Sequence, residues 1–297
     1  LAWTVAPGNA VAGVAIAPAA QVRLSDALGN AVPGQAVALT LVGSGTLSGG
    51  DPVISDANGV ATFATLSVNL AGTKQLRASS GVLPAVTTPT FTVSPAAPAG
   101  LMFTVGPSNA VAGTLISPAV KVKVTDAFGN PIAGSSVSLT LVGSGTLSGG
   151  GAVLTDAVGL ATFSALSVNL TGIKRLTAAS GTLPTITSTT FTIPSAAAAT
   201  LVYAVAPGNV IAGVAMAPAV QVKVSDAFGN AVAGKSVSLA LVGSGTLSGG
   251  GAVASDAAGL ATFSGLSMNL AGAKQLTASS SPLPSVTSAA FTVACPA

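Results

Sequence analysis

Side chains able to do chemistry are scarce in this sequence. It contains no His and no Glu, and its acidic residues are seven Asp. Without His, a Ser–His–Asp triad is excluded, as are the usual zinc sites and the iron sites built from two His and a carboxylate. We therefore expect a chain that is not an enzyme and that has no catalytic residues, no cofactor and no metal ion.

Six of the seven Asp begin the pattern Asp-Ala-x-Gly. Asp in the first position of a turn accepts backbone N–H bonds, and Gly in the fourth position allows a positive φ, so the pattern predicts a type I turn followed by a bulge. Calcium takes roughly six to eight oxygens, often from several carboxylates, which makes these Asp poor calcium ligands. We interpret as turn residues Asp26, Asp56, Asp126, Asp156, Asp226 and Asp256.

The turns recur because the whole sequence repeats every 100 residues without a gap. Residues 41–50 read LVGSGTLSGG, and the same letters return at residues 141–150 and 241–250. Solenoid repeats are shorter, roughly 20 to 45 residues, whereas a unit of this length can form a domain with its own core. We predict three domains, at residues 1–97, 98–197 and 198–297.

Within each repeat, apolar residues alternate with polar ones over short runs, which is the period of a β-strand. Val22 and Leu24 would face a core, while Gln21 and Arg23 would face solvent. Similar runs, separated by turn signals, lie at residues 1–5, 37–41, 53–55, 61–63, 76–78 and 91–93. About seven short strands in a unit of this size predict an all-β fold of three tandem immunoglobulin-like β-sandwich domains.

The segments between repeats are rich in Pro and Ala. Residues 94–100 read SPAAPAG, and residues 194–200 read PSAAAAT. Such linkers are stiffer than Gly/Ser linkers, so we expect the domains to lie end to end in an extended rod.

Three motifs carry a resemblance to a known family. Residues 22–39 follow V-x-[V/L]-x-D-A-x-G-N-x-x-x-G-x-x-V-x-L, residues 55–63 follow [S/T]-D-A-x-G-x-A-T-F, and residues 71–78 follow [A/T]-G-x-K-x-L-x-A. With their counterparts in the other copies, these motifs resemble bacterial Ig-like domains of the invasin/intimin type over essentially the whole chain. The resemblance implies stalk or spacer modules of exported proteins, located outside the cell or on its surface.

The glycine-rich loop LVGSGTLSGG is identical in all copies, although neighbouring loops vary. It matches neither of the two common phosphate-binding patterns and leads into no helix. Since glycines allow a close approach of backbones, we predict that this loop contacts a neighbouring chain. The candidate assembly residues are Gly43, Ser44, Gly45, Thr46, Gly143, Ser144, Gly145, Thr146, Gly243, Ser244, Gly245 and Thr246.

Other recurring positions admit simpler interpretations. An aromatic residue starts each repeat, as Trp3, Phe103 or Tyr203. We interpret it as a core residue or a plug between domains, with a carbohydrate-stacking platform as the alternative. The lone Cys295 can pair between chains or be inert, and its role stays open.

The recurring cations are interpreted as residues of solvated strand faces that protect sheet edges from unwanted pairing. These cations are Arg23, Lys74, Lys121, Lys123, Lys174, Lys223 and Lys274.

Composition narrows the function further. Hydrophobic residues make up 49% of the chain and charged residues only 6%, with a net charge of +3. No apolar run reaches the roughly 20 residues that a membrane helix needs, so we expect no membrane insertion. The scattered cations predict no nucleic-acid partner. A surface with so little charge favours association, so copies of the chain itself are the expected partners.

These observations predict a non-catalytic structural protein of the bacterial exterior, either a self-assembling filament subunit or a surface stalk. One alternative is an adhesin segment that binds a cell-surface glycan or host receptor. A second alternative is a set of accessory modules of a larger secreted enzyme.

Overall fold

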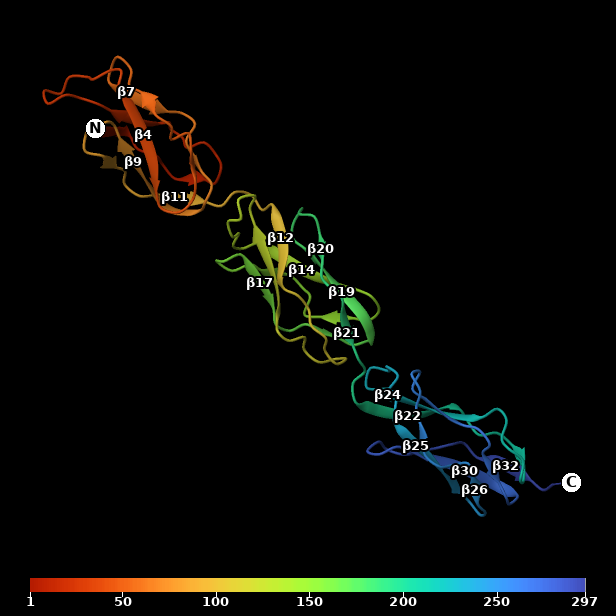
Figure 1. Ribbon diagram of the computed structural model, residues 1–297. Helices are drawn as coiled ribbons and strands as arrows, with labels where there is room; N and C mark the ends of the chain where they lie inside the picture. The colour runs from red at the N-terminus through yellow and green to blue at the C-terminus, as the bar shows by residue number, and fades with distance from the viewer. Residues whose placement is uncertain (297) are drawn as a thin grey trace.

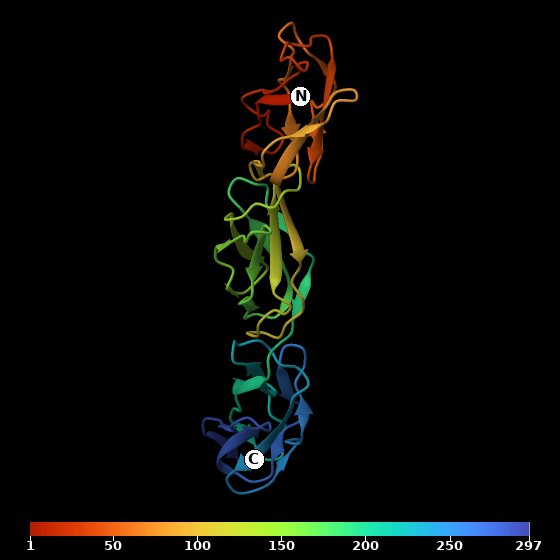
Figure 2. The same cartoon turned by 90° about the vertical axis from the view of Figure 1, so that its left-hand side faces the viewer.

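The computed structural model describes residues 1–296, and the regular elements of this part of the chain are all β-strands. Three domains follow one another in a line, with the two ends of the chain at opposite ends of the molecule (Figures 1 and 2). Each of three separate clusters of buried apolar side chains takes its members from one repeat. The predicted all-β fold of tandem sandwiches is confirmed.

The first domain has two main sheets around its core. One has the strand order β1-β3-β7, and the other has the order β2-β11-β9-β4-β6 with β10 beside β9, while β5 and β8 form a short pair. The bounds are β1 Ala2–Val5, β2 Ala10–Val11, β3 Ala20–Arg23, β4 Ala36–Val42, β5 Leu47–Ser48, β6 Val53–Ile54, β7 Val60–Phe63, β8 Ser67–Val68, β9 Gly72–Ser79, β10 Val86–Thr87 and β11 Phe91–Ser94.

The second domain keeps this arrangement except that no strand corresponds to β2, with sheets β12-β13-β17 and β16-β14-β19-β20, β21 beside β19, and the pair β15-β18. Its strands are β12 Gly100–Val105, β13 Val120–Thr125, β14 Ser136–Val142, β15 Leu147–Ser148, β16 Val153–Leu154, β17 Leu160–Phe163, β18 Ser167–Val168, β19 Gly172–Ala179, β20 Ile186–Thr187 and β21 Phe191–Ile193.

The third domain has sheets β22-β24-β28 and β23-β32-β30-β25-β27, with β31 beside β30 and the pair β26-β29. Its strands are β22 Ala198–Val205, β23 Val210–Ile211, β24 Val220–Asp226, β25 Ser236–Val242, β26 Leu247–Ser248, β27 Val253–Ala254, β28 Leu260–Phe263, β29 Ser267–Met268, β30 Gly272–Ser279, β31 Val286–Thr287 and β32 Phe291–Ala294.

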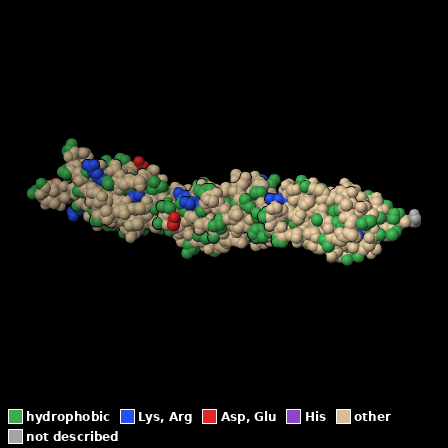
Figure 3. Space-filling model, turned by 90° about the horizontal axis from the view of Figure 1, so that it is seen from below, with side chains coloured by type: hydrophobic (Ala, Val, Ile, Leu, Met, Phe, Trp, Pro, Cys, Tyr) green, Lys and Arg blue, Asp and Glu red, His purple; other side chains and the backbone are tan. Residues whose placement is uncertain are grey.

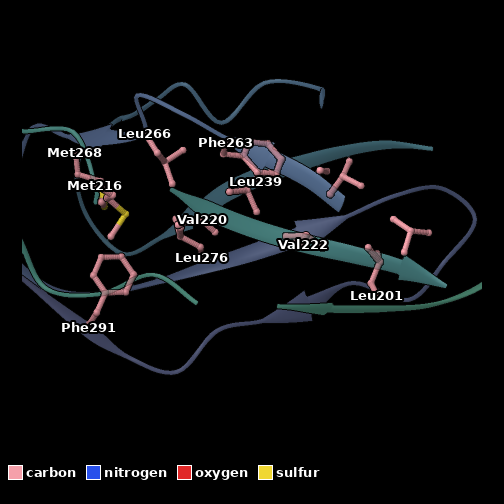
Figure 4. Close-up of a cluster of buried hydrophobic side chains, with 14 of the residues drawn as sticks. Leu201, Met216, Val220, Val222, Leu239, Phe263, Leu266, Met268, Leu276 and Phe291 are labelled. Carbon is pink, nitrogen blue, oxygen red and sulfur yellow. The ribbon is translucent and has the colours of Figure 1, made fainter. Parts of the chain in front are cut away.

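The alternation predicted from the sequence sets which side chains form each core. In β3, Val22 is buried, Gln21 is half-buried and Arg23 is exposed. In the third domain, side chains such as Phe263 and Leu276 lie between the strands and are fully buried (Figure 4). Each repeat therefore carries a core of its own, as a self-contained domain requires.

The Asp-Ala-x-Gly segments form the predicted turns. The Gly29 N–H donates to the Asp26 carbonyl at 3.1 Å, and the Asp26 N–H donates to the Asn30 carbonyl at 3.0 Å. Gly29 has φ +86°, and no residue other than glycine has a positive φ in the described chain. This is a type I turn closed by a glycine bulge, so the prediction from the turn chemistry is confirmed.

Candidate functional site at the domain junctions

The turn that begins at Asp126 lies where the second domain meets the first. Its Oδ1 accepts from the backbone N–H groups of Phe128 and Asn130, at 2.9 and 2.8 Å. The Asn130 side-chain amide donates to the other oxygen, Oδ2, at 2.8 Å. These bonds fix the orientation of the carboxylate and the amide before any neighbour is considered.

The amide of Asn130 then joins the two domains. Its Oδ1 accepts from the Ala71 N–H at 2.9 Å, and its Nδ2 donates to the Asn69 carbonyl at 2.8 Å. The Ala96 N–H, in the linker, donates to Asp126 Oδ2 at 2.9 Å. One turn of the second domain therefore holds both the end of the first domain and the connecting segment.

An aromatic ring completes this junction. Phe128 lies against Gly13 of the first domain so closely that a Cβ on Gly13 would overlap the ring carbons Cζ and Cε2. Gly13 also has φ +71°, a conformation that L side chains rarely adopt. Glycine is therefore needed at this position for two reasons: the backbone has a positive φ, and the ring of Phe128 leaves no space for a side chain.

The second junction repeats the hydrogen bonds of the first. Asn230 Oδ1 accepts from the Thr171 N–H at 3.0 Å, and its Nδ2 donates to the Asn169 carbonyl at 2.8 Å. The Ala196 N–H donates to Asp226 Oδ2 at 2.9 Å.

The aromatic contact of this junction is repeated as well, because Phe228 lies on Gly113 as Phe128 lies on Gly13. Because the same contacts recur, the two junctions orient neighbouring domains in the same way. This agrees with the straight arrangement of the domains in Figure 2.

The junction carboxylates are buried but ionised. Asp126 is only 3% exposed and Asp226 only 1%. Burial by itself raises the pKa of each carboxyl, yet hydrogen bonds from the asparagine side chain and from backbone N–H groups outweigh it and lower the pKa of both below 3.8. At neutral pH each carboxylate therefore remains a charged acceptor for the linker N–H.

The candidate assembly loop of the first domain lies beside the segment, residues 69–71, that contacts Asn130 of the second domain. A Cβ on Gly45 would lie 3.0 Å from Asn69 Oδ1, and the Thr46 N–H donates to that oxygen at 2.7 Å. The counterparts of Thr46 and Asn69 make the same bond in the other two domains. The loop thus supports the segment that contacts the next domain. This support within its own domain accounts for the identical sequence of the loop in the three repeats.

Residues 43–46 are nevertheless exposed. The predicted contact of this loop with a neighbouring chain stays a prediction.

The expectation of solvated lysines was wrong for three of them. Lys74, Lys174 and Lys274 are buried. In β9, Lys74 shares the inward face with Leu76, so its aliphatic stem packs inside while its Nζ donates to Ser44 Oγ at 3.1 Å and to the Ala71 carbonyl at 3.2 Å. Burial lowers the pKa of Lys174.

The aromatic residues at the start of each repeat pack against the cores of their own domains. The Trp3 indole N–H donates to the Val86 carbonyl at 3.3 Å, and the Tyr203 hydroxyl donates to the Leu276 carbonyl at 2.8 Å. Phe103 is half-buried in the same way.

The aromatic contacts between domains come instead from Phe128 and Phe228, which sequence reasoning did not single out. The sequence carried a signal for this contact, because the second and third repeats have phenylalanine at the position where the first repeat has Leu28.

The remaining chemistry of the described chain is sparse. Nowhere in residues 1–296 do three metal-binding side chains gather. No helix in this part of the chain is long and apolar enough to span a membrane. Cys295 is exposed and unpaired. We therefore take the two junctions as the candidate functional site of the described residues.

Comparisons with known proteins found matches among solved structures alone. No family model matches the chain, and no curated protein matches it. Among solved structures it is similar to invasin, a bacterial integrin-binding protein, with 16% identity and a TM-score of 0.43, covering 99% of this chain but 59% of that structure.

Two further solved structures show the breadth of this likeness. InvD of Yersinia pseudotuberculosis has 19% identity and a TM-score of 0.45 over 96% of this chain and 94% of its own. Three Ig domains of titin have 12% identity and a TM-score of 0.38, covering 100% of this chain and 98% of theirs. At identities and scores this low, the likeness carries no argument about function.

Proposed function

We propose that this chain is a non-catalytic stalk segment of the bacterial cell exterior, whose domains are held end to end as a stiff rod. The observation that carries this proposal is the repeated junction, in which Asn130 and Asn230 make the same bonds to the preceding domain. Domains joined as flexible beads would have no reason to bury an Asp and an Asn at each boundary.

The free energy expected from the junction hydrogen bonds supports a stiff rod. Three hydrogen bonds cross or brace each junction, and such bonds contribute about 0.5–1.5 kcal/mol each, with more for a charged acceptor. A sum of about 3 kcal/mol, before the ring contact is counted, leaves an open junction populated at roughly 1% or less. The linker keeps the domains adjacent, so closure costs little translational entropy.

The surface and the motifs support an external location. Charged side chains are few and scattered on the face shown in Figure 3. The sequence motifs resemble those of stalk domains on exported bacterial proteins. The rings of Trp3, Phe103 and Tyr203 are half-buried against their own cores, so they make poor platforms for stacking a sugar, and we favour the stalk over the adhesin segment.

Small-angle X-ray scattering of the full chain tests the stalk. The variant Asn130→Ala/Asn230→Ala should lose the long maximum dimension of the wild-type rod while each domain stays folded by circular dichroism. The matched control is Asn30→Ala, which changes the same turn in the first domain, where Asn30 is exposed. Identical scattering from the double variant and the control would contradict the proposal.

A further inference from the structure

The first domain has a turn equivalent to those that form the two junctions, and this turn already has the same conformation. Asp26 Oδ1 accepts from the Leu28 and Asn30 N–H groups, both at 2.9 Å, and Asn30 Nδ2 donates to Asp26 Oδ2 at 2.9 Å. The turn that begins at Asp126 makes the same bonds. The first turn is thus pre-organised for a partner of the kind that the other two turns contact.

This first turn is uncovered in the structure. Asp26 and Asn30 are exposed, whereas Asn130 and Asn230 are 4% and 5% exposed. Leu28, at the tip, is 87% exposed, compared with 44% for Phe128. An apolar side chain therefore projects from the turn at the place where the other two domains present a phenylalanine.

The far end of the third domain presents the matching surface. Gly213 keeps the positive φ of its counterparts, at +82°, but a Cβ there would meet no atom within 4 Å. Asn269 Oδ1 still accepts from the Thr246 N–H at 2.7 Å, as Asn69 Oδ1 does from Thr46, so the backbone of residues 269–271 is supported in the same way.

The exposure of this end differs from that of the occupied junctions. Asn69 and Ala71 are half-buried, whereas Asn269 and Ala271 are exposed. Leu270 adds an apolar side chain that is 49% exposed. The surface formed by Gly213 and residues 269–271, called here the receiving surface, thus has the backbone groups that correspond to those bonded by Asn130 and Asn230 at the inner junctions.

From these two ends we infer that one copy of this chain docks head to tail on another, with the turn at residues 26–30 seated on the receiving surface of its partner. Asn30 would bond the Ala271 N–H and the Asn269 carbonyl, and Leu28 would lie on Gly213. The inference rests on the proposed stiff rod, because it extends the same junction from one chain to the next.

Two differences make this contact weaker than the inner junctions. The position that matches Ala96 is Pro296, which has no N–H to donate to Asp26. Leu28 also presents less apolar surface than phenylalanine. Since no linker joins the copies, we expect reversible association with a dissociation constant on the order of 1 mM.

Sedimentation and small-angle X-ray scattering over rising concentration test the inference, with the full chain kept reduced so that Cys295 forms no disulfide. The expected species is a dimer of about twice the monomer's length. The variant Leu28→Phe, which restores the residue of the inner junctions, should associate several-fold more tightly. If Leu28→Phe stays monomeric up to about 1 mM, or if its dimer is no longer than the monomer, the inference is overturned.

A matched pair of glycine variants locates the contact in the Leu28→Phe background. Gly213→Asn should abolish association, because a side chain there occupies the space of the docked residue. Gly234→Asn is the control, since Gly234 has φ +73° and also meets no atom within 4 Å. Equal association of both variants would overturn the inference. Scattering at low concentration reports the inner junctions separately, so a failure of docking is distinguishable from a failure of the rod.

Discussion

The ring of Phe128 occupies the space that a side chain at Gly13 would need, and this contact joins two domains. Phe228 and Gly113 repeat the relationship at the next boundary. A glycine of one domain and an aromatic residue of the next therefore form a pair whose closeness depends on how the domains are oriented. The pair makes the junction sensitive to a single methyl group.

Gly13→Ala should open the first junction. The new Cβ overlaps Phe128, and overpacking of this kind costs about 1–3 kcal/mol in addition to the strain of a positive φ. Gly213→Ala is the control, because it carries similar strain with no neighbour. We expect proteolysis of the linker at residues 94–100 to be faster in Gly13→Ala than in Gly213→Ala. Equal rates would show that the ring contact does not hold the junction.

The turn carboxylates predict an acid limit to stability. Hydrogen bonds lower the pKa of Asp26, Asp126 and Asp226 below the ordinary 3.8. A carboxyl with a lowered pKa in the folded state contributes its stability above the ordinary value, and this contribution is lost as the pH falls below 3.8 towards the lowered value. On the acid side, the melting temperature should therefore be level down to about pH 4 and should fall below it.

Replacement of Asp26, Asp126 and Asp226 by Asn should lower the melting temperature at neutral pH. The decrease of the melting temperature in acid should then be smaller than in the wild type. Asp51→Asn, which changes an exposed Asp outside the turns, should leave both unchanged. An unaltered acid profile in the triple variant would refute the role given to these carboxylates.

The glycine-rich loop should tolerate change at one position and not at another. A Cβ on Gly145 would lie 2.9 Å from Asn169 Oδ1, and Gly145 has φ +107°. Gly145→Glu should therefore destabilise the second domain by about 2 kcal/mol or more.

Thr146→Arg, on the exposed side of the same loop, should leave thermal unfolding unchanged, so it is the cleaner probe of any contact with another chain. Equal stability of the two variants would mean that the loop is not constrained by its own domain.

The single tyrosine offers a spectroscopic check on the third domain. Burial raises the pKa of Tyr203 to about 12, although a hydrogen bond with the Ala278 backbone opposes the shift. Because the folded state keeps a proton that the unfolded state loses near pH 10, the stability of this domain should be constant below pH 10 and should decline as the pH rises towards 12. An absorbance titration of tyrosinate with a midpoint near 10 would contradict this environment.

The sequence predicts the strands and turns well because their signals are local. The alternation around Val22 and the turn at Asp26 each depend on residues within one strand or one turn. The burial of Lys74 depends instead on the register of β9, which places it in line with Leu76.

The junction depends on hydrogen bonds from Asn130 to Ala71 and to Asn69, which lie 59 and 61 positions earlier in the chain. No local sequence pattern shows pairs so far apart. The junction's one visible trace is the phenylalanine at positions 128 and 228, where the first copy has Leu28.

Each junction should hold its two domains in one orientation. Spin labels on Thr62→Cys and Thr162→Cys, with Cys295→Ser, report it directly, because both threonines are exposed at equivalent positions of the first and second domains. Pulsed electron resonance should give a single narrow distance distribution, and Asn130→Ala should broaden it. A broad distribution in the chain with Asn130 intact would contradict the stiff rod.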